Sequence, residues 1–426
     1  MNGTTMDSEA FDRAVTRHES RALDFLEALV RQPSHLGHEV GAQEVFAAEL
    51  ADLGFTTTVL PFDDGLADDE RAGVLQDVPG PRQNTYASLT GELRSSLLLH
   101  GHIDVVPAST PELWASDPFE PRRDEGRLYG RGAGDMKCGF AMATLALRAL
   151  RDVVPDFGTW SLGFLAAVEE ECTGNGTLSA ARQGVLADAV VAVEPTGLDL
   201  LLGGVGIVWV DVTVVGRSAH AEAAHLAVNP FDLLWELVAD LRRWTAELSA
   251  AERDPVLRDV ESPYNLNVGV VSGGDWPSSV PGKATARLRL AYPTAWTPEQ
   301  AEHEVAARIA RCAAASGRFP QPPQVRSSGF RAPGYHLDAE HDLAVRLRRA
   351  HQAAHGREPA AYALGSTTDA RTYIRYFDTP AICFGPTAAN IHGIDESVEI
   401  ASIAAGARTL GRFVADWFEE PGGART

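Results

Sequence analysis

The chain contains little cysteine and no long uninterrupted apolar segment. Its four cysteines are scattered and form no C-x-x-C pair, which excludes a disulfide framework and fits a reducing compartment. No stretch approaches the roughly 18 consecutive apolar residues of a membrane-spanning helix, so we expect no membrane partner. The polar, acidic segment 1–12 lacks the basic start and apolar run of a signal peptide. These absences predict a cytoplasmic protein.

Positive charge is also scarce, because 37 Lys and Arg residues stand against 58 Asp and Glu residues and give a formal net charge of −21. Nucleic-acid phosphates and anionic lipids repel a chain this acidic, so we expect neither as a partner. The net charge says little about the charge of a small substrate, because the local charge of a cleft can be opposite to the net charge of the chain. At 426 residues, the chain is long enough for two or three domains.

The first half of the chain alternates predicted strands and helices. Apolar runs without alternation predict strands at 55–60, 86–89, 96–106, 160–168 and 189–193. Helical spacing of apolar residues predicts helices at 11–31, 40–53, 136–151 and 177–184. Apolar strands of this kind are typical of a mostly parallel sheet covered by helices on both faces. We therefore predict an α/β fold with a mostly parallel mixed sheet.

The pattern changes after Glu194. Alternating strands are expected at 208–215, 265–271 and 284–292, and helices at 230–248 and 298–314, which predicts an antiparallel sheet faced by two helices. The alternation of helices and apolar strands then resumes, with helices expected at 338–355, 368–375 and 400–418 and a buried strand at 381–384. We therefore predict an α+β domain at 204–330, inserted into a larger domain whose two parts are 1–203 and 331–426.

Three predicted strands end in acidic or histidine residues. His102 and Asp104 close one apolar run, Glu169 and Glu170 follow another, and Glu194 follows a third. Ligands gather outside the carboxyl ends of strands in such sheets, so we expect these side chains at one rim. Positions i and i+2 of a strand share a face, so Asp104 is expected to support the ring of His102.

Each candidate has a plainer interpretation when it is taken alone. His102 fits a buried histidine bonded to a neighbouring aspartate, and 169–171 fits a solvated acidic turn. Asp135, in a glycine-rich loop before a predicted helix, fits an N-cap. His392, in the loop after the strand at 381–384, fits a surface histidine.

Together the candidates indicate a metal centre. Two histidines and three acids supply nitrogen and oxygen ligands for two divalent ions that share one carboxylate: His102, His392, Asp135, Glu170 and Glu194. Such ligands without cysteine fit zinc, cobalt or manganese. Two ions ~3.5–4 Å apart lower the pKa of a bridging water and polarise a carbonyl. Glu169, left off the metals, is then expected to be the general base.

Four motifs in the chain resemble those of one family. They are His-Ile-Asp-Val-Val-Pro at 102–107, Gly-Arg-Gly-Ala-Gly-Asp-Met-Lys at 130–137, Glu-Glu at 169–170 and Glu-Pro-Thr at 194–196. The family contains the acetylornithine deacetylases, succinyl-diaminopimelate desuccinylases and glutamate carboxypeptidases, which are di-zinc amidohydrolases and metallopeptidases. The resemblance implies a zinc-peptidase-like catalytic domain and an inserted lid and dimerisation domain.

The resemblance also implies a role for each site residue. One metal is expected on His102 and Glu194 and the other on Glu170 and His392, with Asp135 bridging them. It further implies that Asp104 supports His102, that Glu169 is the base, and that the Asp135–Met136 peptide bond is cis.

Two further segments resemble parts of the family outside the metal motifs. Residues 216–221 resemble the segment of the lid histidine, which implies a homodimer in which His220 reaches the partner subunit's active site and steadies the oxyanion. Residues 365–371 resemble the substrate loop, so Arg371 is expected to pair with a substrate carboxylate. A surface arginine paired with an acid is the alternative. The chain departs from the family pattern at 222–230, which concerns the dimer contact more than the metal site.

Other classes of protein fit less well. A dinucleotide-binding oxidoreductase needs a third glycine three places after Gly132, where Asp135 stands, and an acid repels pyrophosphate. The chain also lacks the G-x-S-x-G motif that is typical of a serine hydrolase. A non-catalytic relative of the family is the remaining alternative. The chain contains every expected metal ligand and the expected base, which weighs against it.

We therefore predict a deacylase that uses metal-activated water to cleave the amide bond of an N-acyl amino acid or a related small molecule, with zinc as the expected metal. A dipeptidase or carboxypeptidase is the alternative.

Overall fold

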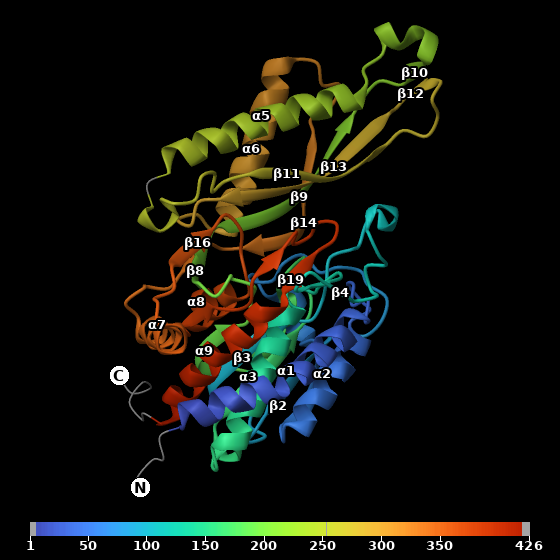
Figure 1. Cartoon of the computed structure of the whole chain (residues 1–426). Coiled ribbons are helices and arrows are strands. Elements are labelled where there is room, and N and C mark those ends of the chain that lie inside the picture. The colour runs from blue at the N-terminus through green and yellow to red at the C-terminus, as the bar shows by residue number, and fades with distance from the viewer. Residues whose placement is uncertain (1–5, 253, 420–426) are drawn as a thin grey trace.

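The computed structural model describes residues 6–252 and 254–419, whose backbone forms two main sheets, one above the other in Figure 1. The lower sheet contains strands from both ends of the chain, and the upper sheet is built from its middle. The chain leaves the lower sheet after Gly204 and returns to it at Tyr335. The predicted domain ranges include residues 1–5, 253 and 420–426, which lie outside the described residues.

In the described residues, the lower sheet has nine strands. In spatial order they are β1 (Thr56–Pro61), β2 (Gln83–Ser88), β6 (Leu162–Ala167), β3 (Ser95–His102), β7 (Ala187–Ala192), β17 (Ala381–Cys383), β8 (Leu200–Gly204) and β15 (Tyr335–His336), with β16 (Ala361–Leu364) paired to β8. The central strands β6, β3, β7 and β17 are parallel, and antiparallel pairs flank them. The predicted mostly parallel mixed sheet is confirmed.

Helices cover both faces of the lower sheet, which its apolar strands require. They are α1 (Ser8–Val30), α2 (Val40–Asp52), α3 (Lys137–Val153), α4 (Asn175–Arg182), α7 (Asp342–His355), α8 (Ala370–Phe377) and α9 (Ile400–Glu419). The largest apolar core joins α1, α2, α3, α7 and α9 to one face, and a second core joins α4 and α8 to the other. Phe46, Phe140 and Phe164 pack ring against ring where α2, α3 and β6 meet.

The upper sheet is antiparallel throughout and is faced by two helices, as predicted. Its strands, in spatial order, are β11 (Leu266–Gly273), β13 (Lys283–Tyr292), β9 (Gly206–Val215) and β14 (Gln324–Ala332), and its helices are α5 (Pro230–Ala251) and α6 (Pro298–Ser316). Valines at alternate positions of β9, from Val208 to Val214, pack against the helices. The residues between them, including Trp209, therefore face the lower sheet.

Small strands and short 3-10 helices complete the fold. A sheet with the order β18 (Ala388–Ala389), β19 (Ser397–Glu399), β5 (Arg127–Tyr129) and β4 (Arg122–Asp124) lies beside the site, and β10 (Ala219–His220) pairs with β12 (Ser279–Val280). The 3-10 helices are Asp64–Asp68, Pro111–Leu113, Phe157–Thr159, Ala221–Leu226 and Pro255–Leu257. Because β5 runs into the loop of Asp135 and β18 and β19 flank His392, the small sheet brings these two loops together.

Most predicted elements lie within a few residues of their observed limits, and the differences at β3 and β8 concern the site. β3 ends at His102 rather than at 106, so Asp104 lies in the loop beyond the strand. β8 was not predicted, because three leucines followed by two glycines carry little strand signal. No helix in the described part of the chain combines the length and the apolarity needed to cross a bilayer.

Candidate active site

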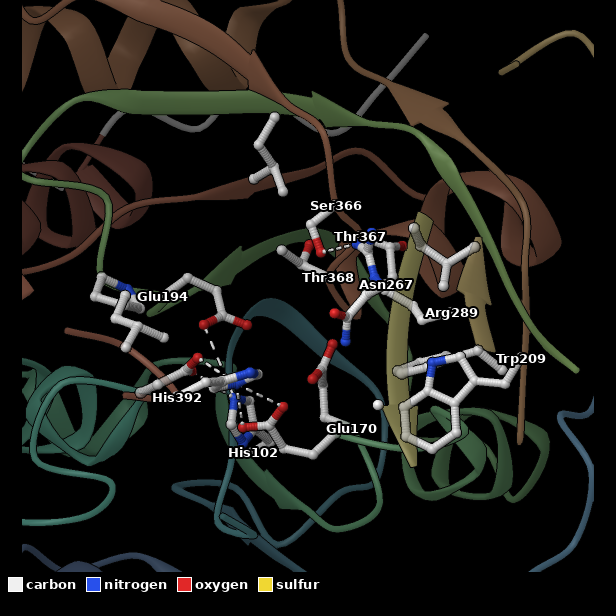
Figure 2. A pocket seen from close by; sticks show the side chains of 18 of the residues that line it. His102, Glu170, Glu194, Trp209, Asn267, Arg289, Ser366, Thr367, Thr368 and His392 are labelled. Carbon is white, nitrogen blue, oxygen red and sulfur yellow. Dashed lines mark hydrogen bonds and ion pairs between the residues drawn. The ribbon is translucent and has the colours of Figure 1, made fainter. Parts of the chain in front are cut away.

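A cavity of about 640 Å³ lies between the two sheets, where the parallel strands of the lower sheet end. Its lower side includes the last residue of β3 and residues that follow β6 and β7, and its upper side is formed by residues of β9, β11 and β13. In Figure 2, His102, Glu194 and His392 lie on one side, with Trp209 and Arg289 on the other. The three strand ends therefore meet at one rim, as predicted.

β3 carries His102 to this rim. Residues 97–99 are buried in the sheet, and His102 is the last residue of the strand. Its Nδ1 lies 3.0 Å from the main-chain carbonyl oxygen of Asp104, which only accepts, so Nδ1 carries a proton. Nε2 then faces the cavity, 3.1 Å from Asp135 Oδ1. A second nitrogen held in this way is the usual arrangement of a metal-ligating histidine.

Asp135 lies between two histidines. Its Oδ1 is 3.1 Å from His102 Nε2, and its Oδ2 is 3.3 Å from His392 Nε2. The Asp135–Met136 peptide bond is cis, as the resemblance implied. Because each oxygen faces a different histidine, the carboxylate has the arrangement of a ligand shared by two cations.

Each histidine has a further acid beside it. Glu194 Oε2, beyond the end of β7, lies 4.0 Å from His102 Nε2. Glu171 Oε2 lies 3.0 Å from His392 Nε2. His102, Asp135 and Glu171 offer ligand atoms that all lie within 4.8 Å of one another. Two sets of nitrogen and oxygen donors therefore share Asp135.

The acids that follow β6 differ from the expected register by one residue. Glu171 faces His392 and Glu170 lines the cavity, whereas Glu169 does not line it. The Glu169 carboxylate is buried against Arg82, whose Nε lies 2.7 Å from Oε1. The structure therefore does not bring Glu169 to the position expected of the base, and the acid beside His392 is Glu171 rather than the expected Glu170.

The main-chain turn after β6 explains this register. β6 ends at Ala167, and Glu169 has a positive φ of 62°. Its carbonyl oxygen accepts hydrogen bonds from the N–H groups of Thr173 and Gly174, at 3.0 and 2.7 Å. Three identical acids in a row carry no signal for which of them faces inward. The buried partner Arg82, distant in sequence, favours one direction for Glu169.

Asp104 holds the acidic turn more directly than it holds His102. Its Oδ1 accepts the N–H of Glu170 at 3.3 Å, and its Oδ2 accepts the N–H of Glu171 at 3.1 Å. Its carboxylate is 3.6 Å from His102 Nδ1, which is closer to the Asp104 carbonyl oxygen. The expected support of His102 thus comes from the main chain of Asp104, because the residue lies beyond the strand end.

A buried ion pair that the sequence did not reveal joins the two ligand loops. Arg131 pairs with Glu396, whose Oε1 accepts the N–H groups of Gly134 and Asp135 at 2.9 and 2.8 Å. Arg131 also donates to the carbonyl oxygen of Gly393 at 3.1 Å, next to His392. Arg131 lies in the motif at 130–137, whereas no sequence pattern indicated that Glu396 belongs to the site. The pair connects the Asp135 loop to the His392 loop.

Besides Asp104 and Glu169, two further predicted residues lie outside the cavity wall. His220 is exposed on β10 and does not line the cavity of its own chain. Arg371, on α8, is buried near Glu170 and Asp369 and also does not line it. The structure therefore does not bring Arg371 to the position expected of a substrate ligand.

The acids and histidines of the rim change each other's pKa values. Burial raises the pKa of Glu194 to about 8 and raises that of Glu170 well above its usual range. Burial opposes ionisation of Asp135, but hydrogen bonds from His102 and His392 hold its pKa below the usual range. Burial alone would lower the pKa of His392, whereas Glu171 and Asp135 raise it to about 11.

This charge distribution fits a pair of divalent cations. The cluster concentrates buried acids that need positive charge, and without metal the histidines supply it by binding protons. Cations displace such protons when they bind, because histidine ligates as the neutral ring. The donors are imidazole nitrogens and carboxylate oxygens, which suit zinc and similar ions. The described residues therefore form a candidate metal site.

Comparisons with known proteins agree with this site. The sequence profile of the peptidase family M20/M25/M40 matches residues 98–416. A succinyl-diaminopimelate desuccinylase of Methylobacterium sp. (strain 4-46) is 33% identical over 393 residues, covering 89% of this chain and 92% of the relative. Another, from Beijerinckia indica subsp. indica, is 30% identical and covers 90% of this chain and 95% of the relative. The dipeptidase Dug1p of Saccharomyces cerevisiae has a similar fold, with a TM-score of 0.79 at 14% identity, covering 98% of this chain and 100% of that chain.

The profile match spans most of the chain and includes the shared carboxylate of Asp135 and the four side chains around it. The desuccinylase relatives extend the similarity over both sheets. The resemblance inferred from the four motifs is therefore confirmed. The chain belongs to the peptidase family M20/M25/M40 and is a hydrolase of amide bonds.

Proposed function

We propose that this chain is a metal-dependent deacylase that cleaves the amide bond of an N-acyl amino acid carrying a free carboxylate. The observation that supports this most is Asp135, whose two oxygens face two histidines that each have a further acid beside them. The similarity to succinyl-diaminopimelate desuccinylases over about nine-tenths of the chain favours an acyl amino acid over other amides.

The proposed metal ligands follow the observed register. His102 and Glu194 would hold one ion, His392 and Glu171 would hold the other, and Asp135 would bridge them. We propose zinc as the metal, with cobalt or manganese as alternatives. When bound, two such ions polarise a carbonyl and lower the pKa of a water molecule.

Glu170 is the proposed general base. It lines the cavity beside the histidines and acids of the rim, and neither proposed ion requires it as a ligand. Its carboxylate takes a proton from the attacking water and returns it to the leaving nitrogen, so one group serves both halves of the reaction.

Arg289 is the proposed anchor for the substrate carboxylate. It lines the cavity and donates to Asn265 Oδ1 at 2.6 Å and Ser366 Oγ at 3.0 Å. Among the described residues, no carboxylate lies within ion-pair distance of it. Burial lowers its pKa to about 10, which is the effect of a cation without an anionic partner. A bound carboxylate would supply that partner with two hydrogen bonds.

The apolar wall beside Arg289 is proposed to hold the non-polar part of the substrate. Trp209 and Phe330 lie edge to face, with ring centres 5.4 Å apart, and both line the cavity with Leu288. Such a wall suits an aliphatic or aromatic side chain or acyl group.

We further propose a homodimer through the upper sheet. β11 is an edge strand without proline, and Val270 and Val271 are 55% and 39% exposed on it. An edge strand of this kind pairs readily with a second copy. His220 would then serve the partner's site. Mixing H220A with D135N tests this: each variant alone should be inactive, and the hybrid should regain activity in one of its two sites. No recovery would contradict the shared site.

The experiment that tests the proposed activity is a hydrolysis screen with added zinc, cobalt or manganese. N-succinyl, N-acetyl and N-formyl amino acids and dipeptides are compared at equal concentration, with bound metal quantified on the same samples. Hydrolysis of acyl amino acids above dipeptides supports the deacylase, and the reverse order supports the dipeptidase alternative. Two bound ions without hydrolysis of any amide would contradict both. A cytoplasmic location stays a prediction.

A further inference from the structure

Arg371 lies behind Glu170, outside the cavity. Its Nη1 is 3.7 Å from Glu170 Oε1, and the residue is only 2% exposed. The guanidinium carbon lies 5.2 Å from the centre of the Phe330 ring, which does line the cavity. The cation of Arg371 therefore meets a protein carboxylate rather than the cavity.

The surrounding chain keeps the guanidinium in this place. Nη2 is 3.6 Å from Asp369 Oδ1, and Asp369 is fully buried. Asp369 Oδ2 in turn accepts from the Thr177 hydroxyl and lies 3.2 Å from His100 Nε2. Gly174, with φ 73°, leaves room for the guanidinium, because a Cβ there would lie 1.8 Å from Nη2. A side chain larger than glycine would displace Arg371.

Besides Asp369, two further acids lie near Glu170. Glu171 follows it directly and faces the metal cluster, and Glu194 lines the same cavity. Like charges repel the Glu170 carboxylate from these acids, so a cation beside it stabilises the position in which it lines the cavity. Arg371 Nη1 is buried and hydrogen-bonds to no described residue, and Glu170 is its ion-pair partner.

We propose that Arg371 is a positioning residue that holds the carboxylate of Glu170 toward the cavity. The inference rests on the proposed role of Glu170 as the base. Arg371 acts through Glu170 and does not touch the substrate, in contrast to Arg289, which lines the cavity. The two arginines should therefore affect different kinetic constants, because a displaced base slows the chemical step and a lost anchor weakens binding.

The first test compares R371A and R371K with R289A in the full chain, using the best substrate of the screen and added zinc. R371A should lower kcat by about 10- to 100-fold, the cost of a misplaced catalytic group, with KM within about twofold and two ions per chain. R371K should recover part of kcat, and it also provides the measurement if R371A does not fold. R289A should instead raise KM. A raised KM with unchanged kcat in R371A or R371K would overturn the proposal in favour of a substrate contact.

The second test combines R371K with E170Q in a double-mutant cycle. If Arg371 acts through Glu170, then R371K should cost nothing further in kcat when Glu170 is already replaced. A full additive loss in the E170Q background would overturn the role of Arg371 while leaving the base assignment intact. Wild-type kcat in E170Q alone would overturn the base assignment itself, and the single variants would then report on Arg371 separately.

Discussion

The two sides of the cavity are built in different ways. On the lower side, His102 is the last residue of a buried parallel strand, and Glu170 and Glu194 follow two others, where short loops direct their side chains. On the upper side, Trp209 and Arg289 project from strand faces at positions that the pleat determines. The lower side concentrates negative charge, and the upper side offers apolar surface and Arg289, a cation with no acidic partner among the described residues. The difference assigns the bond-breaking chemistry to strand ends and substrate selection to strand faces.

The largest expected effect is on the lower side, at the shared carboxylate. D135N removes the anion that both histidines contact, so we expect loss of both ions and of all measurable hydrolysis. Metal content after dialysis, measured together with activity, checks this. Removal of metal from the wild-type chain by a chelator should have the same effect and should be reversed by zinc. An active D135N protein with two ions would remove Asp135 from the centre.

The next effect distinguishes two adjacent acids. E170Q should lower kcat by about 10²–10⁴-fold with both ions retained, because the base is lost while the proposed ligands stay. E169Q is the matched control and should lose less than tenfold, because Glu169 contacts Arg82 and Thr173 rather than the cavity. Steady-state kinetics and metal content, measured on both variants, show which of the two glutamates is the base. The opposite ranking would restore the register expected from the sequence.

A smaller effect is expected at the ion pair that joins the ligand loops. E396Q weakens the contact with Arg131 and with the N–H groups of Gly134 and Asp135, so metal affinity should fall by about 10- to 100-fold. Titration with zinc against a competing chelator measures this. E399Q, an exposed acid on the neighbouring β19, is the control and should leave affinity unchanged.

Substitutions on the upper side of the cavity should change KM rather than kcat. R289A should raise KM by about tenfold or more for substrates with a free carboxylate, since a charge-assisted hydrogen bond contributes roughly 1.5–3 kcal/mol. R287A is the matched control, because Arg287 also lines the cavity but already pairs with Asp211 at 2.8 Å. For substrates whose carboxylate is amidated, R289A and R287A should have similar KM values. Equal KM values in R289A and wild type would mean that the carboxylate binds elsewhere.

The smallest expected effect concerns the outer edge of the upper sheet. V271K places a charge on β11 opposite its own copy, so self-association should weaken by about tenfold. V345K on α7 is a matched control, because Val345 is 38% exposed and Val271 is 39% exposed. Analytical ultracentrifugation of both variants measures the change. A monomeric wild-type chain would contradict the proposed dimer.

Much of the fold was predictable because its strands and helices follow simple apolar patterns. The runs that became β3, β6 and β7 are buried on both faces, so their sequences already show a covered parallel sheet. The residues next to them also predicted the place of the site, since parallel strands end at the same edge. β8 was missed, because glycine carries no strand pattern. Its two glycines are explained only by close packing against β15 and the 365–367 loop.

The sequence by itself determined the fold class, the rim at which the strands end, and the residue types that gather there. It determined these because they depend on local periodicity and on the order of elements along the chain. Only the tertiary structure decided which of three consecutive glutamates faces the histidines, and that Arg371 meets Glu170 while Arg289 meets the cavity. The direction of a side chain in a turn depends on partners far away in sequence, such as Arg82 for Glu169, and no local pattern records them.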